Sequence, residues 1–380
     1  MSDSRRLLIG AALVIIAIAV VALTQILPGS GSSGGLTPSN VQVVRGYLGG
    51  EKTGLLDDPE VQKLLRDRYH LSVDGRKAGS IEMVRDIALT DQDDFLWPSS
   101  QVALAFYKQN PGAKLAKSDN LLNSPIVLYS WAEVTDALIK IGVVEKLGES
   151  YYIVDFPRLI QLVNDGKQWS DIGLPQLHGR ISIHTTDPTL SNSGNLFAGL
   201  LANTFNGGEV VDDASVERVL PQLKLFFTRL GFMEQSSSDL FQQYLTTGMG
   251  AKPMIAGYES QLIEFSVLNE GYRGQLKDKV RVLYPRPTVW SSHPLIARDD
   301  AGVRLLEALK DKDIQDLAWK RHGFRSGLVG VQNDPSVLQV VGVPETVQSV
   351  IDMPSPSVMD RIIQTLSAQI GSPTPTPSVR

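Results

Sequence analysis

The sequence contains no cysteine among its 380 residues. This absence excludes a disulfide framework, a thiolate zinc site, a cysteine nucleophile and a lipid anchor on an amino-terminal cysteine. The chain also lacks a strong excess of charge, since 36 basic and 41 acidic residues give a formal net charge of −5. Such a balance provides no basic surface for a polyanion, so we expect no nucleic-acid partner.

Common catalytic and metal-binding motifs are also missing. The five histidines form no H-E-x-x-H pair, and we expect neither a metal nor a cofactor. The run from Gly46 to Thr53 superficially resembles a phosphate-binding loop, but Glu51 separates glycine from lysine and the spacing is short. The segment LSNSG around Ser193 matches a nucleophile elbow only at its last glycine. We therefore expect no catalytic residues and predict that the chain is not an enzyme.

One long apolar run lies at the amino terminus, from Leu7 to Leu27, and it carries no charge. Arg5 and Arg6 precede it, and its length is near the lower limit for a membrane-spanning helix. The positive-inside rule places residues 1–6 in the cytoplasm and the main body outside the membrane. We predict a single-pass, uncleaved anchor over residues 7–27; a secretory signal cleaved after Ala22 is the alternative.

The rest of the chain alternates strand-like and helix-like segments, which predicts an α/β fold. A helix should begin at Asp58-Pro59, because aspartate is a good N-cap and proline suits the first helical position. Another helix should end at Gly323. Prolines at 285 and 287 favour an edge or crossing strand there. The predicted strand segments are 41–48, 71–75, 125–134, 252–265 and 280–290, and the predicted helices after them are 301–311 and 313–323.

The segment 179–205 is the most informative part of the chain. It predicts a strand with Ile181 and Ile183, a polar turn, and a helix with one apolar stripe. Ser191 or Ser193 stands where an N-cap belongs, and Gly194 lets another group approach the backbone. A helix start carries unpaired N–H groups, so it can hold an anion or a carbonyl oxygen. The alternative is an ordinary capped helix.

The same order of strand, Gly/Ser turn and helix start occurs earlier, around Ser80. With this doubled turn, the chain resembles the extracellular solute-binding proteins of bacterial ABC uptake systems over about residues 40–345. More closely, it resembles the type II periplasmic-binding-protein fold. The segments that carry the resemblance are GYLGGEKTGLLDDPEV, KAGSIEMV, TTDPTLSNSGNLFAGLLA and MIAGYESQLIEF.

The resemblance implies a two-lobed α/β protein with two crossing hinge strands after the membrane helix. Its predicted parts are a flexible linker (28–38), lobe 1 (39–122 and 288–352), lobe 2 (123–287), and a C-terminal helix with a disordered Pro/Thr tail (353–380). It also implies capture of a small polar solute in the cleft. The ligand-binding residues that it assigns are Gly79, Ser80, Ser130, Trp131, Thr189, Ser191, Asn192, Ser193, Gly194, Tyr258, Glu259 and Gln261.

The charge of the solute stays open at this point. A carboxylate at Glu259 favours a cation or an amine, whereas the hydroxyl-rich turn favours an oxyanion or a carboxylate. A ligand of mixed polarity, such as an amino acid, would satisfy both. Trp131 fits the core as well as it fits the cleft.

The partners implied are the solute, an ABC permease or another envelope protein, and the membrane itself through the amino-terminal helix. A membrane helix in place of a cleavable signal or a lipid anchor departs from the family pattern and implies a tethered receptor. The alternative function is a sensor or protein-interaction module of the bacterial cell envelope that keeps the fold without transport.

Overall fold

The computed structural model describes residues 41–370 of the chain. The predicted membrane helix (7–27), the linker (28–38) and the end of the predicted tail (371–380) lie outside the described residues. No helix within residues 41–370 combines the length and the apolar character needed to cross a membrane.

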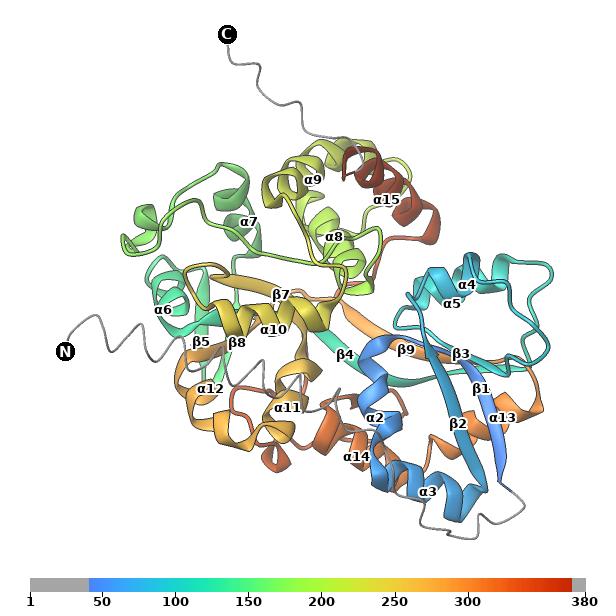
Figure 1. Ribbon diagram of the computed structural model, residues 1–380. Coiled ribbons are helices and arrows are strands. Elements are labelled where there is room, and N and C mark those ends of the chain that lie inside the picture. Colours follow the sequence, from blue (N-terminus) through green and yellow to red (C-terminus); the bar gives the residue numbers. More distant parts are fainter. Residues whose placement is uncertain (1–40, 371–380) are drawn as a thin grey trace.

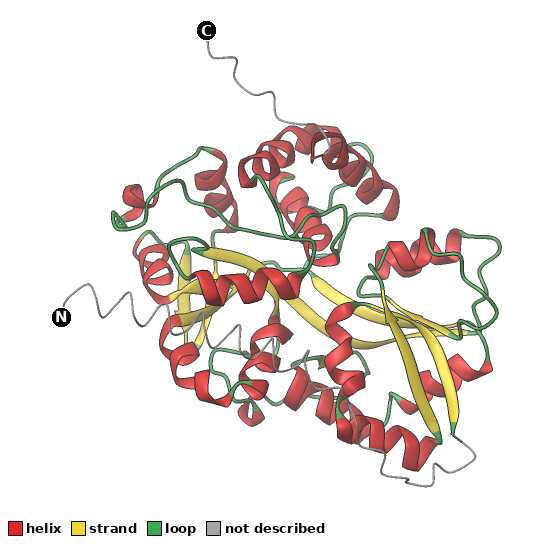
Figure 2. Ribbon diagram, viewed as in Figure 1, coloured by secondary structure: helices red, strands yellow, loops and turns green. Residues whose placement is uncertain are grey.

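A ten-stranded mixed β-sheet runs through the described part of the molecule, with helices around it (Figure 2). The strand order is β2-β1-β3-β9-β4-β8-β6-β5, and β7 and β10 also pair with β4. The strands are β1 Gln42–Leu48, β2 Leu71–Lys77, β3 Phe95–Trp97, β4 Lys117–Trp131, β5 Val144–Leu147, β6 Ser150–Ile153, β7 Met254–Tyr258, β8 Val280–Pro285, β9 Trp290–Ala297 and β10 Arg325–Ser326.

Strand β4 joins two lobes (Figure 1), because its first part pairs with β9 and its second part pairs with β7 and β8. The first lobe contains β1, β2, β3, β9, β10 and the start of β4. Its helices are α2 Thr53–Asp57, α3 Pro59–Tyr69, α4 Glu82–Arg85, α5 Gln101–Gln109, α13 Asp300–Ala308 and α14 Lys312–His322, with the 3-10 turn η1 Gly50–Lys52.

The second lobe contains β5, β6, β7, β8 and the end of β4. Its helices are α6 Ala132–Lys140, α7 Phe156–Asn164, α8 Asn192–Phe205, α9 Val216–Leu230, α10 Ser237–Thr247, α11 Glu259–Leu268, α12 Arg273–Lys279 and α15 Pro356–Ile370. The remaining 3-10 turns are η2 Trp169–Ile172, η3 Glu270–Tyr272 and η4 Pro335–Val337.

Each lobe has its own hydrophobic core. The main core of the first lobe includes Val44, Phe95 and Leu305. The largest core of the second lobe surrounds α8, and α15 contributes Val358 and Ile362 to it. Helix α15 therefore packs on the second lobe, beside α9, although it follows first-lobe elements in the sequence (Figure 1).

Three chain segments connect the lobes side by side. At the first crossing, within β4, the amide of Ile126 donates to the carbonyl of Val289, and the Thr288 hydroxyl donates to the carbonyl of Ile126. At the third crossing, the amide of Ile351 donates to the carbonyl of Thr288. The prediction of two crossings is therefore incomplete, because the chain crosses once more to place α15 on the second lobe. The predicted boundaries between the lobes stay a prediction.

Most predicted elements with local start or stop signals are confirmed. Helix α3 begins at Pro59, and the Asp58 side chain accepts hydrogen bonds from the amides of Glu60 and Val61. Helix α14 ends at Gly323, whose φ of 68° is left-handed. Strands β1 and β2 and helix α13 also lie where the pattern placed them, and β4 and β7 overlap their predicted segments in part.

Two predictions from the pattern are wrong. Ile181 and Ile183 are buried, but they form no strand, because the amide of Ile181 bonds to Lys167 and that of His184 bonds to Met254. Two different partners on the two sides prevent a continuous ladder. The predicted strand 252–265 is wrong in its second half, because β7 ends at Tyr258 and α11 begins at Glu259. Strand β8 itself lies inside the sheet, between β4 and β6, but the crossing predicted from the two prolines follows directly after it, at Thr288.

A buried ion pair ties the lobes together behind the crossings. The Arg325 guanidinium, from β10, donates to both Glu259 oxygens at 2.7 and 3.0 Å, and Glu259 begins α11. The Tyr284 hydroxyl donates to Glu259 Oε2 at 2.6 Å. Arg325 also donates to the carbonyls of Pro344 and Glu345. Every nitrogen of the guanidinium and both carboxylate oxygens therefore have a hydrogen-bond partner. Two charges can be buried together only when they are paired and hydrogen-bonded in this way.

Replacing Arg325 by methionine should therefore destabilise the protein strongly. The change leaves Glu259 buried without its counter-ion, and we expect a loss of about 3–5 kcal/mol in the free energy of unfolding. The matched control is Arg68→Met, which removes an exposed guanidinium paired with Asp311 and Asp313 and should cost much less. Urea denaturation of the purified proteins measures both losses. Equal losses in the two variants would contradict this role of the Glu259–Arg325 pair.

Candidate functional site

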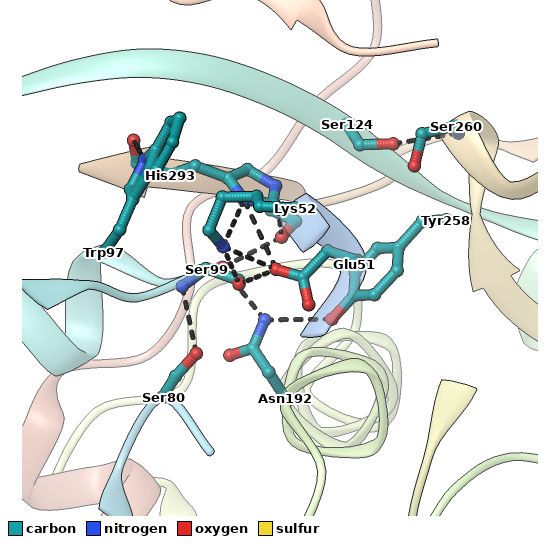
Figure 3. Close-up of polar contacts among 11 residues, drawn as sticks. Glu51, Lys52, Ser80, Trp97, Ser99, Ser124, Asn192, Tyr258, Ser260 and His293 are labelled. Atoms are coloured by element: carbon teal, nitrogen blue, oxygen red, sulfur yellow. Dashed lines mark hydrogen bonds and ion pairs between the residues drawn. The ribbon is translucent and has the colours of Figure 1, made fainter. Parts of the chain in front are cut away.

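The candidate site lies where the carboxyl ends of β1, β2 and β3 face the start of α8. Parallel strands bring the residues that follow them to the same edge of a sheet. Strand β1 is parallel to β2 and to β3. This arrangement places Glu51 and Lys52 after β1, Ser80 after β2 and Ser99 after β3, and Asn192 approaches them from the second lobe (Figure 3).

A polar network centred on Lys52 fills the inner part of this site. The Lys52 ammonium is completely buried and donates to Glu51 Oε1 at 2.6 Å and to Ser99 Oγ at 2.8 Å. Its third contact is His293 Nδ1, at 3.1 Å. The Ser99 hydroxyl also donates to Glu51 Oε1. Each donor position of the ammonium is therefore used, as burial of a cation requires.

The contacts of His293 define its tautomer. Because the ammonium of Lys52 is a donor only, Nδ1 of His293 must be the acceptor and Nε2 must carry the proton. Nε2 lies 3.2 Å from Ser291 Oγ, and the Ser291 hydroxyl donates to the carbonyl of Ser99 at 2.8 Å. The neutral imidazole thus links the Lys52 ammonium to the backbone that follows β3.

Burial and charge act in opposite directions on the charged groups of this network. Burial lowers the pKa of the Lys52 ammonium, and the neighbouring Glu51 carboxylate opposes that shift. Burial would raise the pKa of the Glu51 carboxyl, but Lys52 and His293 lower it to about 2. Burial lowers the pKa of His293 well below its usual value, and Lys52 lowers it further. Burial raises the pKa of Tyr258, so its hydroxyl stays protonated. Glu51 is consequently a carboxylate and His293 is neutral near pH 7.

The two lobes touch at Ser99. Its amide donates to Ser80 Oγ at 2.9 Å within the first lobe. Its carbonyl accepts from Asn192 Nδ2, at the start of α8 in the second lobe, also at 2.9 Å. Asn192 Nδ2 also donates to the Tyr258 hydroxyl at 3.0 Å. Figure 3 shows Ser80 and Asn192 on the same side of Ser99, below the Lys52 network.

A cavity of about 200 Å³ lies next to this contact, between the lobes. The structure brings four of the predicted site residues to its wall: Ser80, Thr189, Ser191 and Asn192. Arg85 and Asp360 close one side with an ion pair of 2.9 Å between α4 of the first lobe and α15 of the second. The Arg85 guanidinium also stacks over the Phe106 ring, 3.6 Å from its centre.

Other predicted residues support this wall from behind. The amide of Gly79 donates to the Glu82 carboxylate. Ser193 is buried, and its hydroxyl lies 2.7 Å from Thr186 Oγ1. A Cβ at Gly194 would overlap the carbonyl oxygen of Thr186, so glycine is needed for close packing of α8 on the preceding turn.

The structure does not bring Ser130 and Trp131 to the cavity. In β4, Ile126 is the residue opposite Tyr258, whereas Ser130 is opposite Met254 at the other end of β7. Trp131 stacks on Tyr244 in the core, with ring centres 4.7 Å apart. Trp131 therefore packs against the hydrophobic core, as the alternative in the sequence analysis allowed, and does not line the cavity.

Two further predicted residues have protein partners. Glu259 pairs with Arg325, as described above, so its carboxylate is not available to attract a cation. Gln261 accepts from the amide of Tyr258 and donates to the carbonyl of Ser237, which caps the start of α11.

The sequence analysis missed the residues of the inner network: Glu51, Lys52, Ser99, Ser291 and His293. The Gly-Gly-Glu-Lys segment contributes to the family resemblance, but its spacing argues against a nucleotide loop, and no ligand-binding role was predicted for Glu51 or Lys52. One signal was available in the sequence. Lys52 follows a strand and a Gly-Gly turn, and ligand sites of α/β sheets lie at the carboxyl ends of strands. Ser291 and His293 lie in a strand far along the chain and carried no such signal. Within residues 41–370, no three His, Asp or Glu residues are grouped as a metal site would require.

A divided mixed sheet with a cavity between its two parts defines a two-lobed α/β fold. The solved structures of similar fold identify it as the fold of the type II periplasmic binding proteins, the solute-binding components of ABC transporters. No protein-family model and no curated protein matches the sequence.

The chain is similar to the periplasmic binding protein AfuA from Actinobacillus pleuropneumoniae, whose structure contains fructose-6-phosphate, with a TM-score of 0.56 and 14% identity over 86% of this chain and 98% of that one. An ABC-transporter substrate-binding protein from Agrobacterium tumefaciens has a TM-score of 0.55 and 14% identity, over 88% and 95%. Iron-bound HitA from Pseudomonas aeruginosa has a TM-score of 0.53 and 13% identity, over 87% and 99%. Because the identities are this low, the comparisons show a similar fold only.

Acid should destabilise the protein before the carboxylates titrate, because its buried histidines resist protonation. Burial lowers the pKa of His184 to about 4, and that of His293 is also lowered. Below about pH 6.5 the unfolded chain binds protons at both positions and the folded protein does not, so stability falls with falling pH. We expect a loss of about 2–4 kcal/mol between pH 7 and pH 5.

The variant His184→Gln should lose about 2 kcal/mol less than the unmodified protein over this range. The matched control, His178→Gln, changes an exposed histidine. Urea denaturation at a series of pH values measures these slopes. If His184→Gln follows the slope of the unmodified protein, the assignment is wrong. The contribution of Glu51 is separate, since it is present above pH 4.5 and is lost only as the pH falls towards about 2.

Proposed function

We propose that this chain is an extracytoplasmic solute-binding protein that encloses a small polar solute between its two lobes. The observation that carries the proposal is the cavity of about 200 Å³ with walls from both lobes. Its volume lies below the range of roughly 300–1,000 Å³ typical of pockets for drug-sized molecules, which favours a small solute.

The wall of the cavity combines apolar side chains, such as Phe106 and Met359, with polar groups that can bind a polar solute. Hydroxyl groups of Ser80, Thr189 and Ser191 and amide groups of Asn192 and Asn195 lie on it. Such groups fix the orientation of a ligand through hydrogen bonds that water would otherwise make. The likeness in fold to proteins whose structures contain a sugar phosphate or iron supports solute binding as a class of function.

The contacts across the cavity support a closing motion. Asn192 reaches Ser99, and Arg85 reaches Asp360, so both contacts must break before a solute can enter. The three crossing segments around Ile126, Thr288 and Ile351 remain as the connection in that open form. A few positions in crossing segments are sufficient for hinge closure around a ligand.

The proposal includes a membrane anchor and a transport partner. The charge-free run 7–27 with Arg5 and Arg6 before it supports an uncleaved single-pass helix with the binding lobes outside the cytoplasm. An ABC permease is the partner that this fold favours, and the tether would keep the receptor near it. Separation of membrane and soluble fractions, with and without the first 28 residues, tests the anchor directly.

A ligand screen by thermal shift tests the central part of the proposal. A saturating solute, at about 100 times its dissociation constant, should stabilise the protein by about 2.7 kcal/mol and raise its melting temperature. The panel should contain sugar phosphates, amino acids, organic acids and inorganic anions, together with metal ions.

The variant Thr189→Trp should remove this shift, because the indole would fill the cavity. Leu268→Trp is the matched control, since it adds the same ring to an exposed position on α11 and should keep the shift. If no member of the panel moves the melting temperature, or if Thr189→Trp responds like the control, solute binding in this cavity is wrong.

A further inference from the structure

Lys52 is a fully buried cation whose counter-ion is its own neighbour in the chain. Its side chain has no exposed surface, whereas that of Glu51 is 15% exposed. His293 is neutral and Ser99 is uncharged, so among the described residues the Glu51 carboxylate is the one acidic group in ion-pair contact with Lys52. A buried ammonium without such a partner would be strongly unfavourable.

The Glu51 carboxylate lies between the two lobes. Figure 3 shows it with Lys52 and Ser99 of the first lobe on one side and with Tyr258 and Asn192 of the second lobe on the other. Both hydrogen bonds from the first lobe, from Lys52 and from Ser99, go to the same oxygen, Oε1. The negative charge of Glu51 also raises the pKa of the Tyr258 hydroxyl, which shows that the two groups interact.

The same groups are well suited to bind the anionic group of a solute. Lys52 supplies a charge, and Ser99, Asn192 and Tyr258 supply hydroxyl and amide donors from both lobes. Asn192 belongs to this group and also to the cavity wall, and Ser80 on the wall accepts from the amide of Ser99. Asn192 is the residue of the inner network that also lines the cavity, so the two lie next to each other.

The backbone at Glu51 allows its side chain to move. Glu51 lies in the single turn η1, after Gly49 and Gly50. A Cβ at Gly50 would meet only the end of the flexible Lys77 side chain, at 3.9 Å, so this side of the turn is open. The Glu51 side chain is 15% exposed, so it already reaches solvent.

We propose that Lys52, Ser99, Asn192 and Tyr258 form an anion subsite and that the Glu51 carboxylate occupies it as a placeholder. This inference rests on the proposed function and specifies its ligand class: a solute with a carboxylate or phosphate group, which displaces Glu51 when it binds. Exchange of one anion for another keeps Lys52 paired throughout. A cationic group would instead place a second positive charge beside a buried ammonium.

Calorimetric titration of the purified full-length chain with two probes, inorganic phosphate and acetate, tests the subsite. Glu51→Gln removes the competing charge with little change in shape, and it should bind at least one probe about tenfold more tightly than the unmodified protein. The tighter probe distinguishes a phosphate ligand from a carboxylate ligand. Asp67→Asn, which neutralises an exposed carboxylate, is the matched control and should not change affinity.

Two changes at Lys52 complete the test, both in the Glu51→Gln background. Lys52→Met should abolish probe binding, and Lys52→Arg should retain part of it because the charge is kept. If the methionine variant does not fold, the probe affinities of Glu51→Gln and Asp67→Asn are sufficient to test the subsite. Equal affinities of Glu51→Gln, Asp67→Asn and the unmodified protein for both probes would overturn the subsite.

The anion subsite and the proposed function fail in different ways. If a solute from the thermal-shift screen is lost in Thr189→Trp but binds Lys52→Met with unchanged affinity, the cavity binds solute and the anion subsite is wrong. If Lys52→Met and Thr189→Trp both lose the solute while Leu268→Trp keeps it, both are supported. If Thr189→Trp keeps the solute, binding in the cavity is wrong.

Discussion

The site depends on one constraint: the ammonium of Lys52 is buried between two lobes and must remain paired with a negative charge. The low polarity of the surroundings makes this pairing much stronger than it would be on the surface, and it makes an unpaired state costly. Glu51 supplies the charge, Ser99 and His293 complete the donor contacts, and Asn192 and Tyr258 close the site from the other lobe. Any solute that enters the inner site must satisfy the same requirement.

The fold serves this constraint by bringing distant residues to one place. Parallel pairing of β1 with β2 and β3 aligns the residues that follow each strand. Strand β9 contributes His293 from 241 positions further along the chain than Lys52. The second lobe reaches the site through α8 and the end of β7. Its position depends on three crossing segments and on the Glu259–Arg325 pair, which lies behind the cleft and acts on the lobes rather than on a ligand.

Local signals in the sequence were sufficient for much of the fold and for part of the site. The Asp58-Pro59 start, the Gly323 end and the turn from Thr189 to Asn192 depend on neighbouring residues, and all lie where they were predicted. The turns around Ser80 and before Asn192 line the same cavity as predicted, although only the turn at Ser80 follows a strand of the sheet.

Features that depend on distant partners could not be predicted in this way. Ile181 and Ile183 have the alternation of a strand, but the amides of Ile181 and His184 bond to Lys167 and Met254 and form no ladder. Glu259 looked like a ligand carboxylate because its partner, Arg325, lies 66 residues away. Lys52 and His293 come together only when β1 and β9 join one sheet, and the pattern of neighbouring residues does not predict that contact.

Closure of the lobes around a solute is the central claim, and a distance measurement between the lobes tests it most directly. Because the chain has no cysteine, spin labels can be placed at only two engineered positions, Asp67→Cys in α3 and Phe232→Cys after α9, both exposed in this structure. The account predicts that a solute from the screen converts a broad distribution, with a longer-distance component, into a single narrow distance. An identical distribution with and without that solute would contradict it.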